Sequence, residues 1–511
     1  MSDAAWSAEE ARPLHRIARN IATRYLLVAA ELIVGLITLP FNLHHLGPEA
    51  YGLWMLTAGI TIHFSLLDLG YGGAMVKFVA QYRAHRDVRA LNETASTVFV
   101  LFTAIGLLAY LVVIAVAFNL DHLFNITSTQ AEIGKWILLI VGLKVMFNFA
   151  FAVYGGVCSG FQRYDINNFV AIATSVLVGL VNIGMVLLGY GVIALVAVTT
   201  AVRLVAFFVY RRNAYKVFPP LSIRPSHFRR SRLREVTAFS VYASMIDWAN
   251  KLNYELDELV IGVFLGAAPV AVWAVAGRII SATQRLTNQG NAVLFPVVVD
   301  SDASNRQGRL QTLLLEGTRL SLATVAPIAL VLIVLAEPIV RGWVGPTMLG
   351  AVPVIQVLAC AVTLRVANAT GTTVLKGSGQ VRYLAMVNLG TGLANLALSA
   401  ALVTRYGLVG VAVGTLIPIA FSSIFIIFPA ACRRVGLPIA RTLRYSVWPA
   451  AWPAVAVGLA LSVVYRATTP TLGLALAEAS AAGLLYVGLF IVAVGRRDRA
   501  NYTARIWELA T

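Results

Sequence analysis

Apolar runs of about 20 residues recur along the whole chain and are separated by short polar segments. At 1.5 Å per residue, a helix of this length crosses a hydrocarbon core of roughly 30 Å. Lipid offers no hydrogen-bond partner to backbone groups, so such spans must be helical. The pattern predicts an all-α polytopic membrane protein with about 14 transmembrane helices. The expected spans are 21–44, 52–73, 94–118, 135–155, 168–189, 192–210, 236–264, 269–294, 318–340, 351–375, 383–404, 408–430, 446–465 and 472–495.

Composition supports a lipid-embedded fold. Hydrophobic residues supply 59% of the chain and charged residues 12%, a balance outside the range of water-soluble domains. The polar N-terminal segment carries Arg16 and Arg19 and shows no small-residue cleavage site, which favours a retained first helix over a signal peptide. Cys158, Cys360 and Cys432 are too few for a disulfide framework and are expected to be packing residues.

The net charge of +17 raises the question of nucleic-acid binding. With the N-terminus inside, about 30 of the 40 Lys and Arg residues fall in cytoplasmic segments, which is the positive-inside pattern. The basic segment 211–235 lacks interleaved aromatic residues for base stacking, so we expect no nucleic-acid partner. Its arginines are expected to lie on anionic membrane lipids, and both termini are expected in the cytoplasm.

Three motifs recur at nearly constant spacing, and this repetition predicts two similar lobes. The offset is 219 residues (266 − 47) for the first two motifs and 216 (406 − 190) for the third. This offset makes the first span equivalent to the seventh, which follows six crossings later. After an even number of crossings the chain again crosses the membrane in the same direction. The repeats are therefore parallel. The motif pairs are Leu46-Gly47 with Trp54 and Leu265-Gly266 with Trp273, Gly160 with Arg163-Tyr164 and Gly379 with Arg382-Tyr383, and Tyr190-Gly191 and Tyr406-Gly407.

This repeat predicts the domain organisation. Two parallel-repeat six-helix lobes are followed by two C-terminal helices, and the substrate site is expected in a cleft between the lobes. The expected segments are a cytoplasmic N-terminal segment 1–20, an N-lobe 21–210, a basic cytoplasmic linker 211–235, a C-lobe 236–430, two further helices in 431–495 and a cytoplasmic tail 496–511.

Ionisable residues inside the spans are the candidate functional residues. Each costs about 2.5 to 3.5 kcal/mol near the bilayer centre, so such groups usually face a cavity. The span 236–264 carries one polar stripe, and in 269–294 Arg278 and Arg285 share a face with Ser281. The first stripe comprises Asp247, Lys251, Glu255 and Glu258, with Asp257 nearby.

Five other spans carry single charges, namely Glu31, Asp68, Lys144, Arg203 and Arg365. Structural pairing between helices is the simpler interpretation for Lys144 and Arg203. If the stripes line the cleft, their guanidinium groups suit a phosphate carried on a lipid. An organic cation would prefer the carboxylates but would be repelled by the arginines.

Several motifs resemble those of a known family. They are Leu46-Gly47 with Tyr51-Gly52-Leu53-Trp54, Leu67-Asp68-Leu69-Gly70, residues 160–165, and Asp257 with Val260-Ile261-Gly262. The chain resembles, over nearly its whole length, the polysaccharide transporters or O-antigen (oligosaccharide-lipid) flippases of the multidrug/oligosaccharidyl-lipid/polysaccharide exporter superfamily.

The resemblance implies a flippase that moves a polyprenyl-pyrophosphate-linked oligosaccharide across the bacterial inner membrane by alternating access. Family members keep cations in a central lumen, and Arg278, Arg285, Lys251 and Arg365 are the candidates for that role. The coupling or lumen carboxylates would be Glu31, Asp68, Asp247, Glu255, Asp257 and Glu258. Expected partners are the lipid-linked oligosaccharide and, beyond it, a polysaccharide polymerase and glycosyltransferases.

Two other functions stay open. The first is a cation-coupled multidrug or metabolite exporter: drug exporters of the superfamily use carboxylates in helices 1 and 7, and Glu31 and Glu255 match these positions. A lipid II flippase is less favoured, because those flippases have Arg in helices 1 and 2, where this chain has Glu31 and Asp68. A membrane-embedded glycosyltransferase or polymer ligase would need a substantial outside loop, and the outside loops here are short. No nucleotide-binding or zinc motif is present, so we expect no enzyme, no cofactor and no metal.

Overall fold

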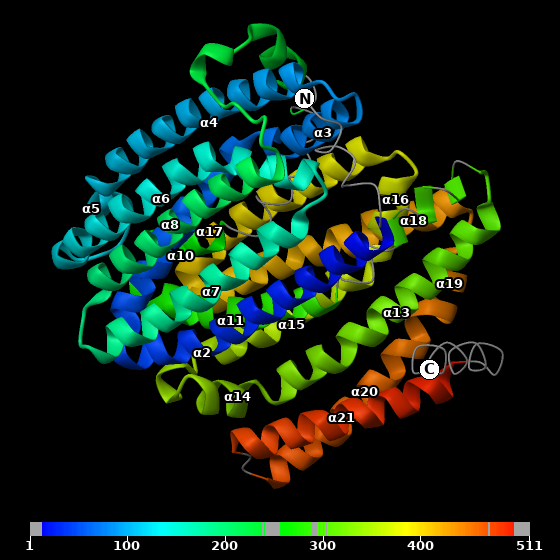
Figure 1. Cartoon of the computed structure of the whole chain (residues 1–511). Helices are drawn as coiled ribbons and strands as arrows, with labels where there is room; N and C mark the ends of the chain where they lie inside the picture. The colour runs from blue at the N-terminus through cyan, green and yellow to red at the C-terminus, as the bar shows by residue number, and fades with distance from the viewer. Residues whose placement is uncertain are drawn as a thin grey trace. The chain divides into compact units, whose positions relative to one another are not determined.

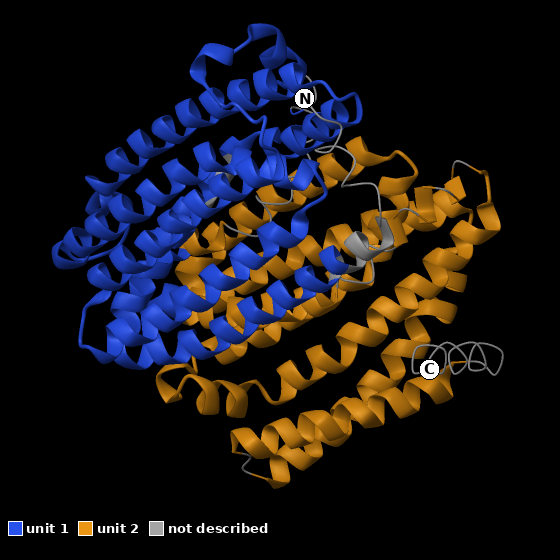
Figure 2. Ribbon diagram, viewed as in Figure 1, with its two compact units in different colours: residues 1–251, 261–271 blue, residues 252–260, 272–511 orange. Residues whose placement is uncertain are grey.

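The computed structural model describes residues 13–237, 240, 256–287, 294–295, 297–299, 301–302, 304–468 and 471–494. Within these residues every regular element is a helix, and the all-α fold expected from the sequence is confirmed. The chain divides into two compact units, which are residues 1–251 with 261–271, and residues 252–260 with 272–511 (Figure 2).

Unit 1 is a bundle of long helices joined by short turns (Figure 1). Its first helix, α2, has non-helical backbone at Gly47, so it is two helices joined at a kink. The elements are α2 (Pro13–Ile62), the 3-10 segment η1 (His63–Asp68), α3 (Tyr71–Ala84), α4 (Val88–Ala117), α5 (Leu120–Leu123), α6 (Ser128–Gly160), α7 (Tyr164–Leu187), α8 (Val192–Val217) and the 3-10 segment η2 (Pro225–His227).

Unit 2 holds the remaining helices, and α10 and α11 each have part of their length in unit 1. The elements are α10 (Asp257–Phe264), α11 (Ala267–Thr287), α13 (Gln307–Val334), α14 (Ala336–Trp343), η3 (Pro346–Met348), α15 (Ala351–Ala367), α16 (Ala369–Gly377), α17 (Val381–Phe421), the π-helical η4 (Ser422–Ile427), α18 (Phe428–Val435), α19 (Ile439–Thr442), the π-helical η5 (Leu443–Val447), α20 (Trp448–Ala467) and α21 (Leu472–Ala493).

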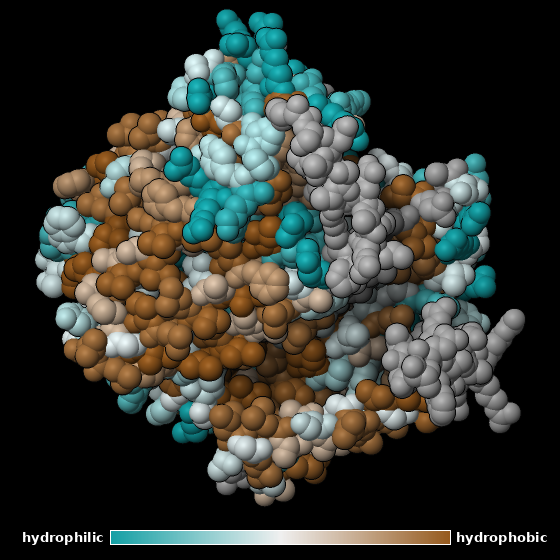
Figure 3. Space-filling view, in the orientation of Figure 1, coloured by the Kyte–Doolittle hydropathy of each residue, from teal (hydrophilic) through white to brown (hydrophobic). Residues whose placement is uncertain are grey.

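Ten helices in the described part of the chain are long and apolar enough to span a membrane. One of them, Val381–Val435, covers two expected spans, and another, Ala22–Thr61, covers the first expected span and the first half of the second. Large apolar side chains face outward on these helices; Leu111 is 62% and Leu180 63% exposed. Hydrophobic residues also cover the visible sides of the unit 1 bundle (Figure 3). Exposed apolar area on this scale is stable in lipid and not in water, so the chain is a multi-pass membrane protein.

The internal repeat is visible in the backbone. A positive φ angle is uncommon and marks a particular kind of turn. Four residues of unit 1 that have a positive φ are matched by a residue with positive φ that lies 217 to 219 positions later. The pairs are Gly47 and Gly266, Arg86 and Asn305, Gln162 and Gly379, and Gly189 and Gly407. The first helix after the Arg86 turn begins at Val88 and the one after Asn305 at Gln307, again 219 positions apart (307 − 88).

These turns also correct one of the sequence matches. Sequence similarity pairs Gly379 with Gly160, but Gly160 is the last residue of α6 and has helical backbone. The left-handed residue of that turn is Gln162, so Gln162 and Gly379 occupy the equivalent place. At this turn, the alignment based on sequence similarity therefore differs by two residues from the alignment based on backbone conformation.

The expected span 52–73 is interrupted. Helix α2 ends at Ile62, η1 follows, and Leu69 and Gly70 then take consecutive left-handed conformations that no α-helix contains. The Asp68 carboxylate accepts a hydrogen bond of 3.1 Å from the backbone N–H of Gly72 in the first turn of α3. Asp68 thus stabilises a helix start, because the first N–H groups of a helix have no partner within it.

The basic linker folds back on unit 1 as an ordered segment, residues 218–236, which we call the strap. A polar face of α4 holds it: Asn92 bonds the backbone of Pro220 at 3.0 Å and of Ser222 at 2.8 Å, and the Ser96 hydroxyl accepts from the N–H of Arg224 at 3.1 Å. In all, five hydrogen bonds between side chains of α4 and the backbone of the strap fix its path.

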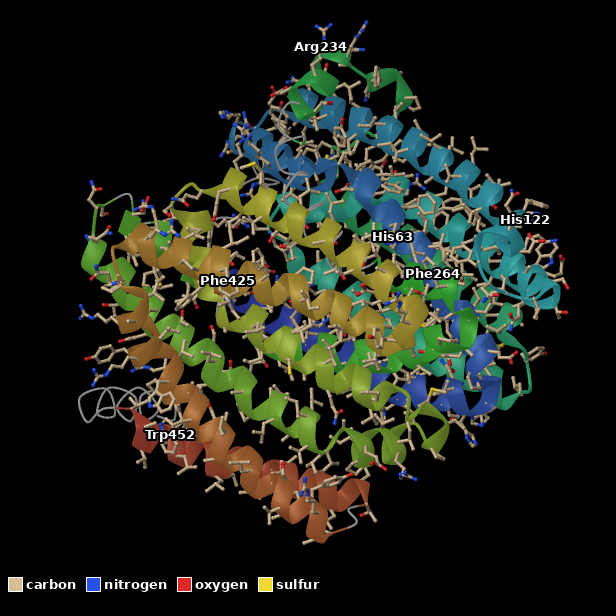
Figure 4. All side chains as sticks on the ribbon, turned by 180° about the vertical axis from the view of Figure 1, so that it is seen from behind. His63, His122, Arg234, Phe264, Phe425 and Trp452 are labelled. Carbon is tan, nitrogen blue, oxygen red and sulfur yellow. The ribbon has the colours of Figure 1, made fainter. Side chains whose placement is uncertain are left out.

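Charges on the strap are also used for its own attachment. Arg232 and Arg229 reach Glu93 at 3.4 and 3.7 Å, and Arg232 also bonds Glu235 at 3.0 Å. The strap arginines were expected to lie on lipid headgroups, whereas these two contact a carboxylate of α4. Other strap arginines are exposed, and Arg234 projects from the strap away from the helices of unit 1 (Figure 4).

Candidate functional site

Asp257 is the most deeply buried of the predicted site residues that the structure describes. It begins α10 and is 6% exposed. Its Oδ2 accepts a hydrogen bond of 3.0 Å from the Thr415 hydroxyl, and its Oδ1 lies 3.5 Å from Nδ2 of Asn395, a long contact. A buried carboxylate needs such polar neighbours, since an isolated charge in an apolar interior is unstable.

The partners of Asp257 come from the two arms of the kinked helix α17. Asn395 and Ser399 lie one turn apart on the first arm, with 2.9 Å between Ser399 Oγ and Asn395 Oδ1. The chain turns back at Gly407 (φ 56°, ψ −137°), and Thr415 on the second arm then lies 3.3 Å from the same Asn395 oxygen. We call Asp257, Asn395, Ser399 and Thr415 the carboxylate cluster.

Two glycines allow the arms to approach this closely. A Cβ on Gly410 would lie 2.4 Å from the carbonyl oxygen of Leu402, and one on Gly414 would lie 2.5 Å from Ser399 Oγ. Glycines four residues apart let helix backbones touch in membranes, where packing replaces the hydrophobic effect as the source of stability. The cluster thus depends on small residues as well as on polar ones.

The chemistry of the cluster suits a proton or a hard cation. Its side chains offer the Asp257 carboxylate, one amide oxygen and two hydroxyls, and the Val411 carbonyl lies 3.3 Å from Ser399 Oγ. All are oxygen atoms, which alkali and alkaline-earth cations prefer. In the described part of the chain no three His, Cys, Asp or Glu side chains gather, so a multi-carboxylate metal site is not found there. Arg365 of α15 interacts electrostatically with Asp257.

Unit 1 contains a second group of charges, on three different helices. Glu31 of α2 and Lys144 of α6 both interact electrostatically with Arg203 of α8. The sequence identified each of them as a single charge, with structural pairing as the simpler interpretation for Lys144 and Arg203. The structure brings all three together, and we call them the unit 1 charge group.

The predicted cationic stripe lies on a continuous helix. Arg278 and Arg285 both belong to α11, where seven residues separate them by about 20° around the axis, and Arg285 is exposed. Glu258 follows Asp257 in α10 and is half-buried. The remaining stripe residues Asp247, Lys251 and Glu255 lie outside the described residues, and their place in a lumen stays a prediction.

Sequence reasoning missed the neutral half of the carboxylate cluster. Asn395, Ser399 and Thr415 carry no charge, so a search for ionisable groups passes over them. A usable signal existed: Asn395 and Ser399 are spaced i, i+4 within an apolar helix, where polar side chains are costly unless they meet a partner. Arg319 of α13, which is 6% exposed, was also missed, because the expected span began only one residue before it.

Comparison with solved structures defines the class of fold. The chain is similar to the lipid II flippase MurJ in an inward closed conformation, with a TM-score of 0.73 and 18% identity over 93% of this chain and 98% of MurJ. It is also similar to a multidrug resistance MATE family transporter of the MOP superfamily in an inward-facing conformation, with a TM-score of 0.63 and 18% identity over 82% of this chain and 97% of the transporter. These likenesses show a shared fold.

Sequence comparison identifies the family. A match to the polysaccharide biosynthesis protein family runs over residues 45–353, which is more than half of the chain. The chain belongs to this family, as the motifs in the sequence suggested. A relative, the probable flippase AglR of Haloferax volcanii, is 23% identical over 419 residues that cover 80% of this chain and 82% of AglR.

Proposed function

We propose that this protein is a flippase that moves a polyprenyl-pyrophosphate-linked oligosaccharide, the repeat unit of an O-antigen or exopolysaccharide, across the bacterial inner membrane by alternating access. The observation that carries the proposal is the family match, which starts in α2 of unit 1 and ends in α15 of unit 2. The name of AglR and the fold of MurJ support the same class of activity. Both termini are proposed to be cytoplasmic.

The α11 arginines are the proposed contacts for the cargo. Arg278 and Arg285 are presented on one helix face within two turns, which is a spacing that a diphosphate and its first sugar could bridge. Guanidinium groups bind phosphate oxygens through paired N–H donors and remain charged at any physiological pH. Lys251 and Arg365 are proposed to add positive charge along the path.

The carboxylate cluster is the proposed coupling site. A proton or monovalent cation at Asp257 would neutralise the one acidic group there, and the neutral ligands of α17 would complete its coordination. An ion gradient could then bias the two conformations, because the ion stabilises only the one in which the cluster is assembled. Glu31, Asp68, Asp247, Glu255 and Glu258 are the other carboxylates that could contribute.

Two experiments test the proposal. Deletion of the gene in the native host should cause the lipid-linked repeat unit to accumulate on the cytoplasmic face, and absence of accumulation would contradict the cargo. For coupling, the purified Asp257→Asn variant in proteoliposomes should lose the dependence of transport on an imposed ion gradient. The matched control is Asp121→Asn, which changes an exposed aspartate in α5.

A second function is favoured by one observation. The carboxylate cluster is also what a cation-coupled multidrug or metabolite exporter would need, and the MATE likeness shows that the fold accommodates such transporters. Dye efflux driven by an ion gradient, and lost in both Asp257→Asn and Glu31→Ala, would favour the exporter. The alanine change at Arg278 should leave efflux of a cationic dye intact in that case, because the arginine would repel such cargo.

A further inference from the structure

The unit 1 charge group lies at one depth in the bundle, as the helix registers show. Between α2 and α7, Thr23 Oγ1 accepts a hydrogen bond of 3.0 Å from Asn168, and a Cβ on Gly179 would lie 2.8 Å from Val34. Both contacts join residues that are 145 positions apart (168 − 23 and 179 − 34). Glu31 is therefore level with the α7 residue that lies 145 positions further on.

The neighbouring helix α8 runs antiparallel to α7. Tyr210 donates a hydrogen bond of 3.4 Å to the carbonyl oxygen of Asn167, which fixes the register of the two helices. Counting forward along α7 and back along α8 by the same number of residues from this bond brings Val176, the residue level with Glu31, opposite Ala201. Arg203 lies within one turn of that point.

Helix α6 gives the same depth for Lys144. Phe151 of α6 stacks on Phe207 of α8 with 5.7 Å between ring centroids, and the two helices run parallel. Moving seven residues toward the start of each helix places Lys144 beside Thr200. Glu31, Lys144 and Arg203 thus share one level, about 16 Å along α8 from its first residue and near the middle of a span.

Arg203 lies on the side of α8 that is away from lipid. On α8, the exposed Val205 and Phe208 lie roughly 140 to 160° around the axis from Arg203, while the buried Val196 lies within about 20° of it. Arg203 is nevertheless exposed, so it faces accessible space on the inner side of its helix. This is the position expected of a ligand contact and not of a lipid-facing or snorkelling residue.

On the α2 side, the same geometry holds for Glu31. The exposed Ile33 and Leu26 lie about 160° and 140° from it around the axis, and the buried Leu27 lies about 40° away. Glu31 is half-buried on the inner face of its helix.

The charges in this group do not balance. The group holds two cations and one carboxylate, with Arg203 interacting electrostatically with both Lys144 and Glu31. Within the part of the chain that the structure describes, neither Lys144 nor Arg203 forms a hydrogen bond or an ion pair. The buried carboxylate of unit 2, Asp257, has a different environment: it accepts a hydrogen bond from the Thr415 hydroxyl and lies 3.5 Å from the Asn395 amide nitrogen. Neutral side chains thus supply the hydrogen bonds to Asp257, whereas Glu31 interacts electrostatically with the cation Arg203.

We propose that Lys144 and Arg203 form an anion-binding site in unit 1 for a phosphate or diphosphate group, with Glu31 as the competing counter-charge. The inference rests on the proposed function, in which the cargo carries a prenyl diphosphate. The Arg203 guanidinium supplies paired donors, the Lys144 ammonium supplies a point charge, and the anion supplies the negative charge that Glu31 alone does not. A lipid headgroup phosphate would offer the same chemistry.

Binding of farnesyl diphosphate to the purified full-length protein in neutral detergent tests this site. Arg203→Gln and Lys144→Gln should each weaken binding by about tenfold or more, which is the loss expected for one charge-assisted contact. Glu31→Gln should tighten binding, since it removes the competing charge. Arg203→Lys should keep part of the affinity, and Arg230→Gln on the exposed strap should leave it unchanged.

The pattern of results separates the site from a purely structural ion cluster. Unchanged affinity in Arg203→Gln and Lys144→Gln, or weaker binding in all three variants with lower thermal stability, would overturn the inference. If inorganic diphosphate displaces farnesyl diphosphate and phosphatidylglycerol does not, the site is assigned to the diphosphate of the cargo. If phosphatidylglycerol also displaces it, the site binds phosphate groups that include those of lipid headgroups. If the affinities shift as predicted but the reconstituted protein moves no lipid-linked oligosaccharide, the proposed function fails and the anion site stands.

Discussion

Replacing Gly414 by alanine tests how the carboxylate cluster is assembled. The new Cβ would lie 2.5 Å from Ser399 Oγ and 2.6 Å from the Ser399 backbone nitrogen. The hydroxyl could rotate away, but the backbone nitrogen belongs to a helix and cannot. Relief of the overlap requires the two arms of α17 to separate by roughly 1 Å, since carbon atoms pack at about 3.5 to 4 Å.

The magnitude follows from this overlap. Overpacking of a tightly packed contact costs about 1 to 3 kcal/mol, and the midpoint of thermal unfolding should fall by several degrees. Thr415 follows Gly414 directly, so the 3.0 Å hydrogen bond to Asp257 should lengthen as the arms move apart. Loss of ion-coupled transport should accompany the loss of stability.

Thermal unfolding of the purified variants, in a Cys360→Ser background that removes the one exposed cysteine of the three, can be followed with a thiol-reactive dye, because Cys158 and Cys432 are fully buried until the protein unfolds. The matched control is Gly390→Ala on the first arm of the same helix, where a Cβ would meet no atom within 4 Å. That change should stabilise the helix by about 0.5 to 1 kcal/mol. Equal unfolding temperatures for the two variants would refute the close approach of the arms.

Two further predictions concern the cargo arginines of α11 and the attachment of the strap. Arg278→Ala and Arg285→Ala should each abolish transport while the protein stays at normal abundance in the membrane, whereas the control Arg230→Ala should be tolerated. Complementation of a deletion strain measures transport. Full activity of both α11 variants would remove the reason for an anionic cargo. Glu93→Gln should release the strap from α4 and increase trypsin cleavage at its arginines several-fold, and a cleavage rate no different from that of the control Glu132→Gln would contradict the attachment.

Much of the fold could be predicted because the solvent leaves few choices. In lipid the backbone must be helical, so apolar length alone located most elements: the expected span 351–375 corresponds to α15 and α16, and 472–495 to α21. The end of the helix at Ile62 was not predicted, because apolar residues continue in the sequence beyond this point. Local backbone conformation at Leu69 and Gly70, and not hydropathy, ends the helix there.

Contacts between distant residues were harder to predict than the spans. The meeting of Asp257 with Asn395 and Thr415 depends on the turn at Gly407 and on close packing at Gly414, neither of which is visible as a charge pattern. The attachment of the strap was not predicted for a related reason. Counting arginines assigns each one to the membrane surface, whereas two of them, Arg229 and Arg232, lie within 4 Å of the Glu93 carboxylate of α4.

Reconstitution into a defined membrane shows directly whether the protein moves a lipid-linked oligosaccharide between leaflets. The purified protein would be reconstituted into vesicles that hold a prenyl-diphosphate-linked oligosaccharide in both leaflets, and the glycan exposed outside would be trimmed by an added glycosidase. We expect wild-type protein to make the inner pool of glycan accessible over time and Arg278→Ala protein to leave it inaccessible. Trimming that stops at the outer leaflet with wild-type protein, as in protein-free vesicles, would contradict this expectation.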